Sequence, residues 1–194
     1  MSASTATQQR MSELAWLVLG IRSAFAGISD MDRWQPATGS AAAADLEVYE
    51  RLAGVQNPRI VLETICTHLE LASAYAGGLA AVIEANEVMV SPWPLARGVL
   101  ESCACATSVL GEPPPTGTAL DRLAHAYNER LFSDGEAIER LKARNSGDAA
   151  PLVARRAQLH SETRTVFPGV TRDDMSSRRV TGIKRPNMIA RMTW

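Results

Sequence analysis

Hydrophobic positions recur every three or four residues along most of this chain, which is the period of an α-helix. The most regular stretch runs from Asn57 to Gly111 and predicts two consecutive helices. One stripe of the first helix contains Val61, Ile65, His68, Ala72, Tyr75, Leu79 and Val82. The second helix is expected to begin with Ser91 as its N-cap and Pro92 at its first position, and to end at Gly111. We expect the two helices to form an antiparallel hairpin at the centre of the core.

The same period predicts four further helices around this hairpin. They run from Gln9 to about Gly27, Ala41 to about Val55, Thr118 to about Arg144, and Ala150 to about Val166. The helix from Gln9 has a broad apolar face and is expected to be well buried. The S-x-x-E sequence from Ser133 to Glu136 resembles a capping box and indicates a break and restart in the helix from Thr118. The pair Gly77-Gly78 indicates a close helix crossing, because glycine is otherwise unfavourable inside a helix.

Outside these helices the periodicity is lost. Residues 1–8 are polar and are expected to be disordered, residues 9–166 to form one helical bundle domain, and residues 167–194 to be a basic, poorly ordered segment with a final helical turn from Asn187. The prolines of E-P-P-P-T-G-T, after Gly111, predict a rigid linker. No strand pattern and no internal repeat is found in the sequence. The predicted fold is all-α: an antiparallel helical bundle of about five to six helices with an irregular basic C-terminal segment.

Composition and cysteine usage narrow the class of protein. A chain of 194 residues is long enough for one domain with a single core. Its three cysteines, Cys66, Cys103 and Cys105, fall in apolar helices and are odd in number, which favours buried reduced thiols over a disulfide framework. The polar N-terminus does not resemble a signal peptide, and no apolar run reaches the ~20 residues of a membrane span. We therefore expect a cytoplasmic protein with no membrane partner.

The formal net charge of −1 hides a strong asymmetry along the chain. Residues 1–136 carry 8 basic and 16 acidic side chains, whereas residues 137–194 carry 12 basic and 5 acidic ones. The basic end could dock on acidic helices of this chain or of a partner subunit, or it could bind the phosphate backbone of nucleic acid. We favour docking, and the lack of interleaved aromatic residues argues against base stacking.

Three polar residues of the predicted hairpin form the first candidate site, for ligand binding. His68 lies on the apolar stripe, and Arg97 and Glu101 are one helical turn apart, which suits a mutual ion pair. In an antiparallel hairpin Arg97 is near the end of the first helix that is remote from His68, so the three need not meet. We favour a hydrogen-bonded core histidine beside a register-fixing ion pair. The second hypothesis is a polar pocket for an anionic small molecule.

The sequence R-R-A-Q-L-H contains the second candidate site, a catalytic pair made by Arg155 and His160. This spacing resembles the R-x-x-x-x-H motif of the HEPN superfamily of helical ribonucleases. The resemblance implies that the two side chains act across a dimer on an RNA phosphate and the ribose 2′-hydroxyl. A cation can stabilise developing phosphorane charge while an imidazole moves a proton. The residue after the arginine is Arg156, which departs from the polar residue usual at that position.

Three short sequences also resemble a set of all-helical actinobacterial proteins with no established activity. They are P-L-A-R-G-V-L-E-S-C-A-C-A-T-S-V-L, R-x-x-x-A-Y-N-E-R-L and R-P-N-M-I-A-R, and they lie between Arg59 and Arg191. The resemblance implies a helix with an R-x-x-x-E pair, then a proline-containing linker and further helices. It also implies a chain that continues past this C-terminus with another helix pair.

No strong catalytic or metal-binding motif is found in the sequence. Cys103-Ala104-Cys105 directs its thiols to different sides of a helix, so no zinc or other metal is expected. There is no Gly-rich phosphate loop, no H-E-x-x-H and no G-x-S-x-G, and we expect no cofactor. The predicted function is that of an interaction or regulatory protein, with a protein partner or self-association as a dimer. The alternative is a HEPN-like ribonuclease that uses Arg155 and His160.

Overall fold

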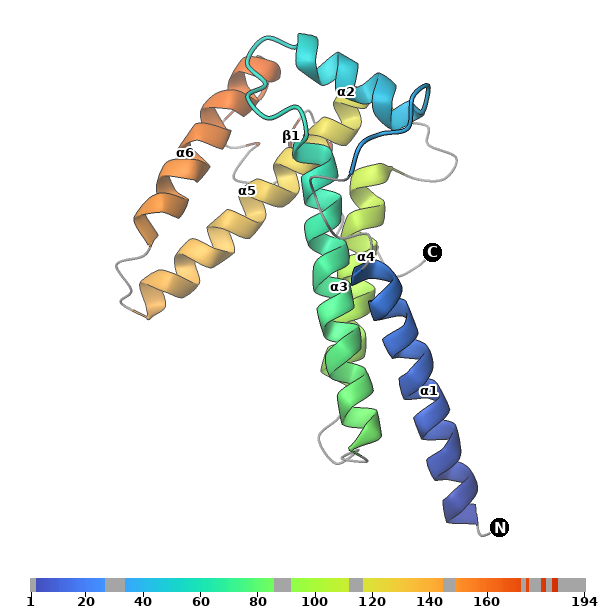
Figure 1. The fold of residues 1–194 in the computed structure, drawn as a ribbon. Coiled ribbons are helices and arrows are strands. Elements are labelled where there is room, and N and C mark those ends of the chain that lie inside the picture. The colour runs from blue at the N-terminus through green and yellow to red at the C-terminus, as the bar shows by residue number, and fades with distance from the viewer. Residues whose placement is uncertain are drawn as a thin grey trace. The chain divides into compact units, whose positions relative to one another are not determined.

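The computed structural model describes residues 3–26, 34–85, 92–111, 117–144, 149–171, 174, 179–180 and 183–184. In these residues the elements are α1 Ala3–Ala26, α2 Ala41–Arg51, α3 Ile60–Glu84, α4 Trp93–Leu110, α5 Ala119–Ala143, α6 Ala149–Val166, β1 Arg179–Val180 and β2 Ile183–Lys184 (Figure 1). Helices that pack on one another account for nearly all of this structure. The predicted all-α helical bundle is therefore confirmed.

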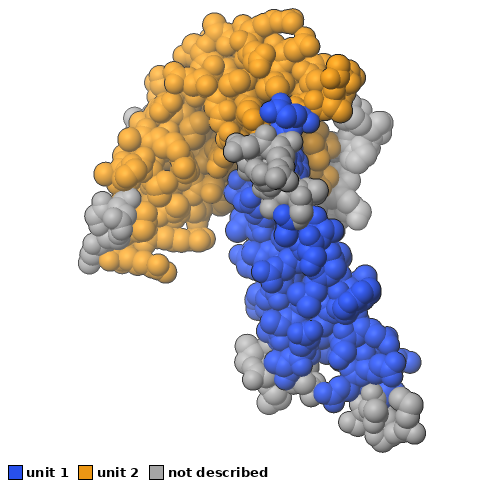
Figure 2. Space-filling view, in the orientation of Figure 1, with its two compact units in different colours: residues 1–35, 65–106, 188–194 blue, residues 36–64, 107–187 orange. Residues whose placement is uncertain are grey.

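The chain divides into two compact units, which are coloured separately in Figure 2. Unit 1 comprises residues 1–35, 65–106 and 188–194, and so contains α1 and most of α3 and α4. Unit 2 comprises residues 36–64 and 107–187, and contains α2, α5, α6 and the two strands. The predicted helical domain over 9–166 ends at the residue where α6 ends, and its status as one domain stays a prediction.

Glycines set the close packing of unit 1. A Cβ built on Gly78 would lie 3.4 Å from Leu95, and one on Gly98 would lie 2.7 Å from the ring of Tyr75. From the first contact to the second, the position falls by three residues on α3 and rises by three on α4, so these helices are antiparallel as predicted. A Cβ on Gly77 would lie 2.7 Å from the guanidinium of Arg22 on α1. Each glycine of this pair faces the side chain of a different helix, and the predicted close crossing stays a prediction.

The first helix is much less buried than predicted. It meets α3 through Ala15, which packs with Ala80 and Ile83 and is flanked by Met11, Val18, Leu19 and Leu79. Four large apolar side chains remain exposed: Leu14 by 45%, Trp16 by 75%, Leu17 by 57% and Ile21 by 62%. The prediction of a well-buried helix is wrong because the apolar residues cover more of the circumference of α1 than α3 contacts. The helix also begins at Ala3, earlier than the expected Gln9.

Unit 2 is built on the pairing of α5 with α6. Tyr127 of α5 hydrogen-bonds to Glu162 of α6, and Asp134 of α5 pairs with Arg155 of α6. Between the two contacts the position rises by seven residues on α5 and falls by seven on α6, so the helices are antiparallel. The ring of Phe167, just after α6, meets the Tyr127 ring edge to face, with centroids 6.2 Å apart.

The predicted break in α5 at Ser133–Glu136 is wrong, since α5 is continuous from Ala119 to Ala143. Asp134 does not act as part of a cap, because its buried carboxylate accepts hydrogen bonds from Arg155 on the neighbouring helix. Gly135 lies against the guanidinium of Arg156. Of the four residues from Ser133 to Glu136, Asp134 and Gly135 contact α6, and Ser133 and Glu136 are exposed.

Several helix ends agree with the sequence signals. The first residue of α5 follows Thr118, whose hydroxyl accepts from the Asp121 N–H at 3.2 Å, while the Asp121 carboxylate accepts from the Thr118 N–H at 2.7 Å. This reciprocal pair is a capping box and confirms the predicted start. Gly111 follows α4 with a φ of +89°, the left-handed conformation expected of a residue just past a helix end. The predicted N-cap Ser91 lies outside the described residues.

The two short strands were not predicted. They pair antiparallel, with Arg179 opposite Lys184 and Val180 opposite Ile183. Val180 is fully buried, and its N–H donates to the side-chain oxygen of Asn128 on α5 at 3.1 Å. A strand of two residues is too short to show a period in the sequence. The strand is stabilised by its contact with α5, which the local sequence pattern does not reveal. The prolines of the predicted linker and the predicted turn from Asn187 lie outside the described residues.

None of the described helices is long and apolar enough to cross a membrane.

Candidate functional site

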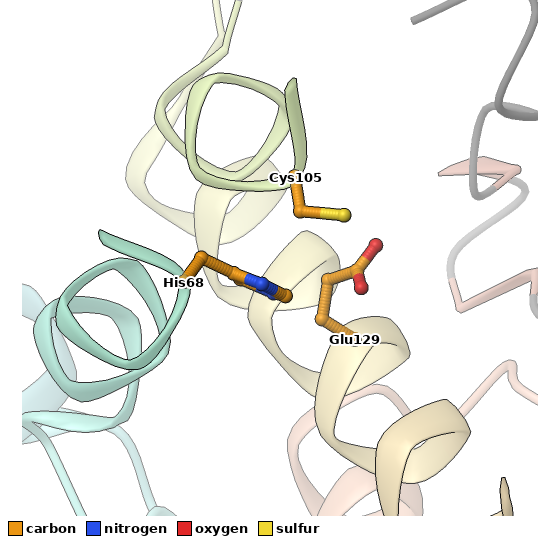
Figure 3. Close-up of side chains that lie close together, drawn as sticks. All are labelled: His68, Cys105 and Glu129. Carbon is orange, nitrogen blue, oxygen red and sulfur yellow. The ribbon is translucent and has the colours of Figure 1, made fainter. Parts of the chain in front are cut away.

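His68 of α3 and Cys105 of α4 face each other in unit 1 (Figure 3). The imidazole nitrogen and the thiol sulfur that could act as ligands lie within 4.8 Å of each other. The pair continues the register of Tyr75 and Gly98, because His68 is seven residues earlier on α3 and Cys105 seven residues later on α4. His68 is half-buried and Cys105 is buried. The neighbour of His68 on α4 is thus a thiol that the sequence analysis did not select.

The predicted ion pair between Arg97 and Glu101 is present, with Arg97 Nε donating to Glu101 Oε1. The Arg97 side chain is 55% exposed and that of Glu101 is 24% exposed. Glu101 precedes Cys105 by one helical turn on α4. The structure therefore places an ion pair at the surface of α4 and, one turn further along, the contact between Cys105 and His68. A pocket for an anionic molecule formed by His68, Arg97 and Glu101 stays a prediction.

An imidazole and a thiol are both metal ligands, and a structural zinc site takes four such ligands. His68 and Cys105 supply two within unit 1. Glu129, the third side chain drawn in Figure 3, is a buried carboxylate on α5 of unit 2. The expectation that the chain has no metal stays a prediction.

Arg155 of the second candidate site is held by a buried carboxylate. Its Nε donates to Asp134 Oδ2 at 2.9 Å, and its Nη2 donates to the other oxygen of the same carboxylate. The Asp134 side chain is 2% exposed, whereas that of Arg155 is 54% exposed. The hydrogen bonds to Asp134 raise the pKa of Arg155. One edge of this guanidinium is therefore fixed to α5, while about half of the side chain is exposed.

His160 lies on the same helix as Arg155 but does not project from the same face. Five residues at 3.6 per turn rotate a side chain by about 500°, which leaves the two directions about 140° apart. Arg155 is directed at α5, and His160 is half-buried at a different angle around α6. The two residues of one chain are therefore not brought together on one face of α6. Their catalytic role stays a prediction.

Arg156 of α6 has a buried side-chain donor that is not satisfied. Its Nε is buried and has no hydrogen-bond partner. Its guanidinium carbon and both terminal nitrogens lie within 3.4 Å of where a Cβ on Gly135 would be. The guanidinium of Arg156 therefore lies against the backbone of α5 at Gly135. The sequence contained one signal for this contact: Gly135 lies in the middle of a helix, and a glycine there leaves room for a neighbouring group.

A buried tyrosine and glutamate join three segments of unit 2. The Tyr127 hydroxyl donates to Glu162 Oε1 at 2.5 Å, and the backbone N–H of Gln56 donates to the same oxygen at 2.9 Å. Tyr127 is fully buried and Glu162 is 6% exposed. Burial and, after it, the hydrogen bond to Glu162 raise the pKa of Tyr127. With its acceptor filled by two donors, this carboxylate serves to hold the α2–α3 connection and α5 against α6.

A second network joins α2 to the start of α5. Arg122 donates to both oxygens of Asp45, at 2.6 and 2.7 Å, and to the Gly117 carbonyl at 2.8 Å. The Tyr49 hydroxyl donates to the Ala119 carbonyl at 2.9 Å. Burial, followed by the charge of Asp45, raises the pKa of Tyr49. These contacts are structural, because every strong donor is directed at an acceptor within the fold.

All three cysteines are free thiols, as predicted. Cys66 and Cys105 are buried, but Cys103 is exposed, so the prediction that all three are buried is wrong for Cys103. Two positions on a helix correspond to a rotation of about 200°, so Cys103 and Cys105 point to nearly opposite sides and cannot both face α3. Partial burial still raises the pKa of the Cys103 thiol.

Several arginines of the basic C-terminal segment lie outside the described part of the chain, namely Arg172, Arg178, Arg185 and Arg191. Arg179 and Lys184 occupy opposite positions in β1 and β2. Binding of nucleic acid by this segment stays a prediction.

Comparison of the chain with family models, with curated proteins and with solved structures gives no match.

Proposed function

We propose that this chain is a helical interaction protein that self-associates through α1 of unit 1. The observation that carries this proposal is the exposed apolar surface of α1. Leu14, Leu17 and Ile21 follow one another at steps of three and four residues, which is the spacing of a helix-pairing seam. We call these three residues the α1 stripe. Trp16, which is more exposed than any of them, lies beside the stripe on the same helix.

A second copy of the same stripe is the partner that fits this surface. Two identical helices related by a two-fold axis place the same apolar residues against each other, which is the commonest way soluble chains associate. The stripe contains no charge, and the formal net charge of one chain is only −1. Two copies therefore approach without strong electrostatic repulsion.

The size of the exposed surface predicts a weak dimer. Complete burial of one large apolar side chain contributes about 1.5–3 kcal/mol. Trp16 and the three residues of the α1 stripe are each about half or more exposed. A two-fold pair then gains about 10 kcal/mol, against an association cost of at least ~4 kcal/mol. The difference corresponds to a dissociation constant on the order of tens of micromolar.

Light scattering coupled to size exclusion tests this proposal over a range of protein concentration. The mass is expected to rise from the 20.9 kDa of one chain toward twice that value as the concentration passes the dissociation constant. Leu17→Glu should keep the mass at that of one chain. Val153→Glu is the matched control, because Val153 is 46% exposed on α6 and lies outside the stripe. A wild-type chain that stays monomeric several-fold above the expected constant would refute the proposal.

A ribonuclease that uses Arg155 and His160 is the second candidate function. It is supported by the arrangement of Arg155, whose guanidinium is oriented by buried Asp134 while more than half of the side chain is exposed. A cation fixed in this way is suited to stabilise charge that develops on a phosphate. Because the two residues of one chain diverge around α6, the mechanism requires His160 from a second chain. If the purified protein leaves RNA intact, or if His160→Ala cleaves as well as wild type, this candidate is excluded.

A further inference from the structure

We propose that Arg156 and Arg155 of α6, held against Gly135 and Asp134 of α5, form a binding site for a phosphate group. The two arginines are consecutive, and they contact consecutive residues of α5. Both guanidinium groups are therefore brought to the same short stretch of α5 in unit 2. This site is separate from the α1 stripe and does not depend on self-association.

Among the described residues, only one of the two arginines at this site is paired with a carboxylate. Asp134 accepts both hydrogen bonds from Arg155 and so neutralises one guanidinium. Arg156 makes no hydrogen bond or ion pair with the described residues, and its Nε is buried without a partner. A buried donor without an acceptor is costly, and a cationic one more so. An anion that reaches Arg156 would supply the missing acceptor.

The shape of α5 at this point admits a planar cation and little else. A Cβ at Gly135 would lie 3.3 Å from the guanidinium carbon of Arg156, tighter than ordinary contact. Glycine thus lets the guanidinium lie flat on α5, although glycine inside a helix is less stable than alanine. Arg155 is fixed to Asp134 through Nε and Nη2, and its side chain is 54% exposed. The two groups together offer several donors to one ligand.

A phosphate is the ligand that matches these donors. Guanidinium groups bind phosphate oxygens with two parallel hydrogen bonds, and a dianion or phosphodiester can accept from two arginines at once. The phosphate could belong to a free phosphate or to a nucleic-acid backbone. The chemistry at Arg156 is the same in both cases.

Titration with inorganic phosphate, followed through the arginine Nε–H signals of the ¹⁵N-labelled full chain at constant ionic strength, tests the site. We expect a saturable shift of the Arg156 signal. In Arg156→Ala, where the Arg155 Nε–H signal is followed instead, binding should be weaker by about tenfold or more, the effect of losing a hydrogen bond to a charged group. Arg164→Ala removes an exposed arginine of the same helix and should change affinity less than twofold. Gly135→Ala should also weaken binding, because the added methyl displaces the guanidinium.

The source of the phosphate follows from a second titration with short single-stranded RNA. Displacement of inorganic phosphate from Arg156 by RNA assigns the site to a nucleic-acid backbone, and binding of phosphate without such competition assigns it to a free phosphate. His160→Ala should bind phosphate as wild type does, so loss of RNA cleavage and loss of the anion site are separable. The proposal is overturned if phosphate leaves the Arg156 signal unchanged, or if Arg164→Ala weakens binding as much as Arg156→Ala. Circular dichroism of each variant shows that it is folded.

Discussion

Replacing Tyr127 by phenylalanine removes one oxygen atom from the interior of unit 2. The lost hydroxyl donates to Glu162 Oε1 at 2.5 Å, and both side chains are buried. Glu162 keeps the N–H of Gln56, at 2.9 Å, as a donor. A hydrogen bond to a charged group contributes about 1.5–3 kcal/mol, so Tyr127→Phe should lower the free energy of unfolding by about 2 kcal/mol. For a chain of this length that loss corresponds to a midpoint about 4–8 °C lower.

Urea unfolding followed by circular dichroism measures this change, with an unaltered m-value showing that the mutation acts on stability alone. Tyr75→Phe is the matched control, because Tyr75 is 39% exposed in unit 1 and its removal of a hydroxyl should cost little. A double-mutant cycle with Glu162→Gln isolates the interaction between the two side chains. If Tyr127→Phe costs no more than Tyr75→Phe, the buried hydrogen bond does not stabilise the α5–α6 pair and this reasoning is refuted.

Three further predictions concern buried groups. Burial raises the pKa values of Tyr49 and Tyr127 above the ordinary 10.0, so the unfolded chain releases these protons first; stability should be complete below pH 10 and fall above it by up to about 1.4 kcal/mol per pH unit for each tyrosine, and an alkaline unfolding series in which the double phenylalanine variant falls as steeply would contradict this. Arg155→Ala should cost about 3 kcal/mol because it leaves the Asp134 charge buried and unpaired, whereas Asp134→Asn should cost less because Arg155 can be hydrated; equal losses in thermal unfolding would count against the assignment. Maleimide should label Cys103 alone in the native chain and all three cysteines in urea, as mass spectrometry of the labelled peptides can show; native labelling of Cys66 would disprove the burial pattern.

Local sequence signals predicted the helices well because their causes are local. Thr118 and Asp121 lie in the same helical turn and satisfy each other's backbone groups, so the start of α5 is encoded within four residues. Gly111 ends α4 through its own backbone conformation. The same reasoning failed at Ser133–Glu136, where α5 continues without a break and Asp134 pairs with Arg155, 21 residues further along the chain. A capping sequence shows that a helix can begin at a position, but contacts with residues distant in the sequence also affect whether it does.

The burial of α1 could not be predicted for a related reason. Periodicity shows which residues share a face, but it does not show whether another helix meets that face. Ala15 is buried by Ala80 and Ile83 of α3, while Leu17 and Ile21 stay 57% and 62% exposed. The broad apolar face that the sequence showed for α1 is therefore partly exposed and does not all belong to the core.

The candidate sites were predicted in part. Arg97 and Glu101 pair as their spacing requires, since both lie on one helix. The contact of His68 with Cys105 depends on the register between α3 and α4. The sequence of the segment that joins the two helices does not determine this register. In the sequence, Asp134 and Gly135 were part of a predicted helix break. Their contacts with Arg155 and Arg156 follow only from the antiparallel packing of α5 and α6.

The central claim, that two copies of the chain meet through α1, is tested most directly by paramagnetic relaxation between chains. A spin label is placed at Gly20→Cys in a Cys103→Ser background, because a side chain at Gly20 has open space around it. Labelled chains are mixed with unlabelled ¹⁵N chains at a concentration above the expected dissociation constant. Association through α1 should broaden the amide signals of α1 in the unlabelled chains and leave those of α6 unchanged. Unchanged α1 signals, or broadening spread evenly over both helices, would contradict it.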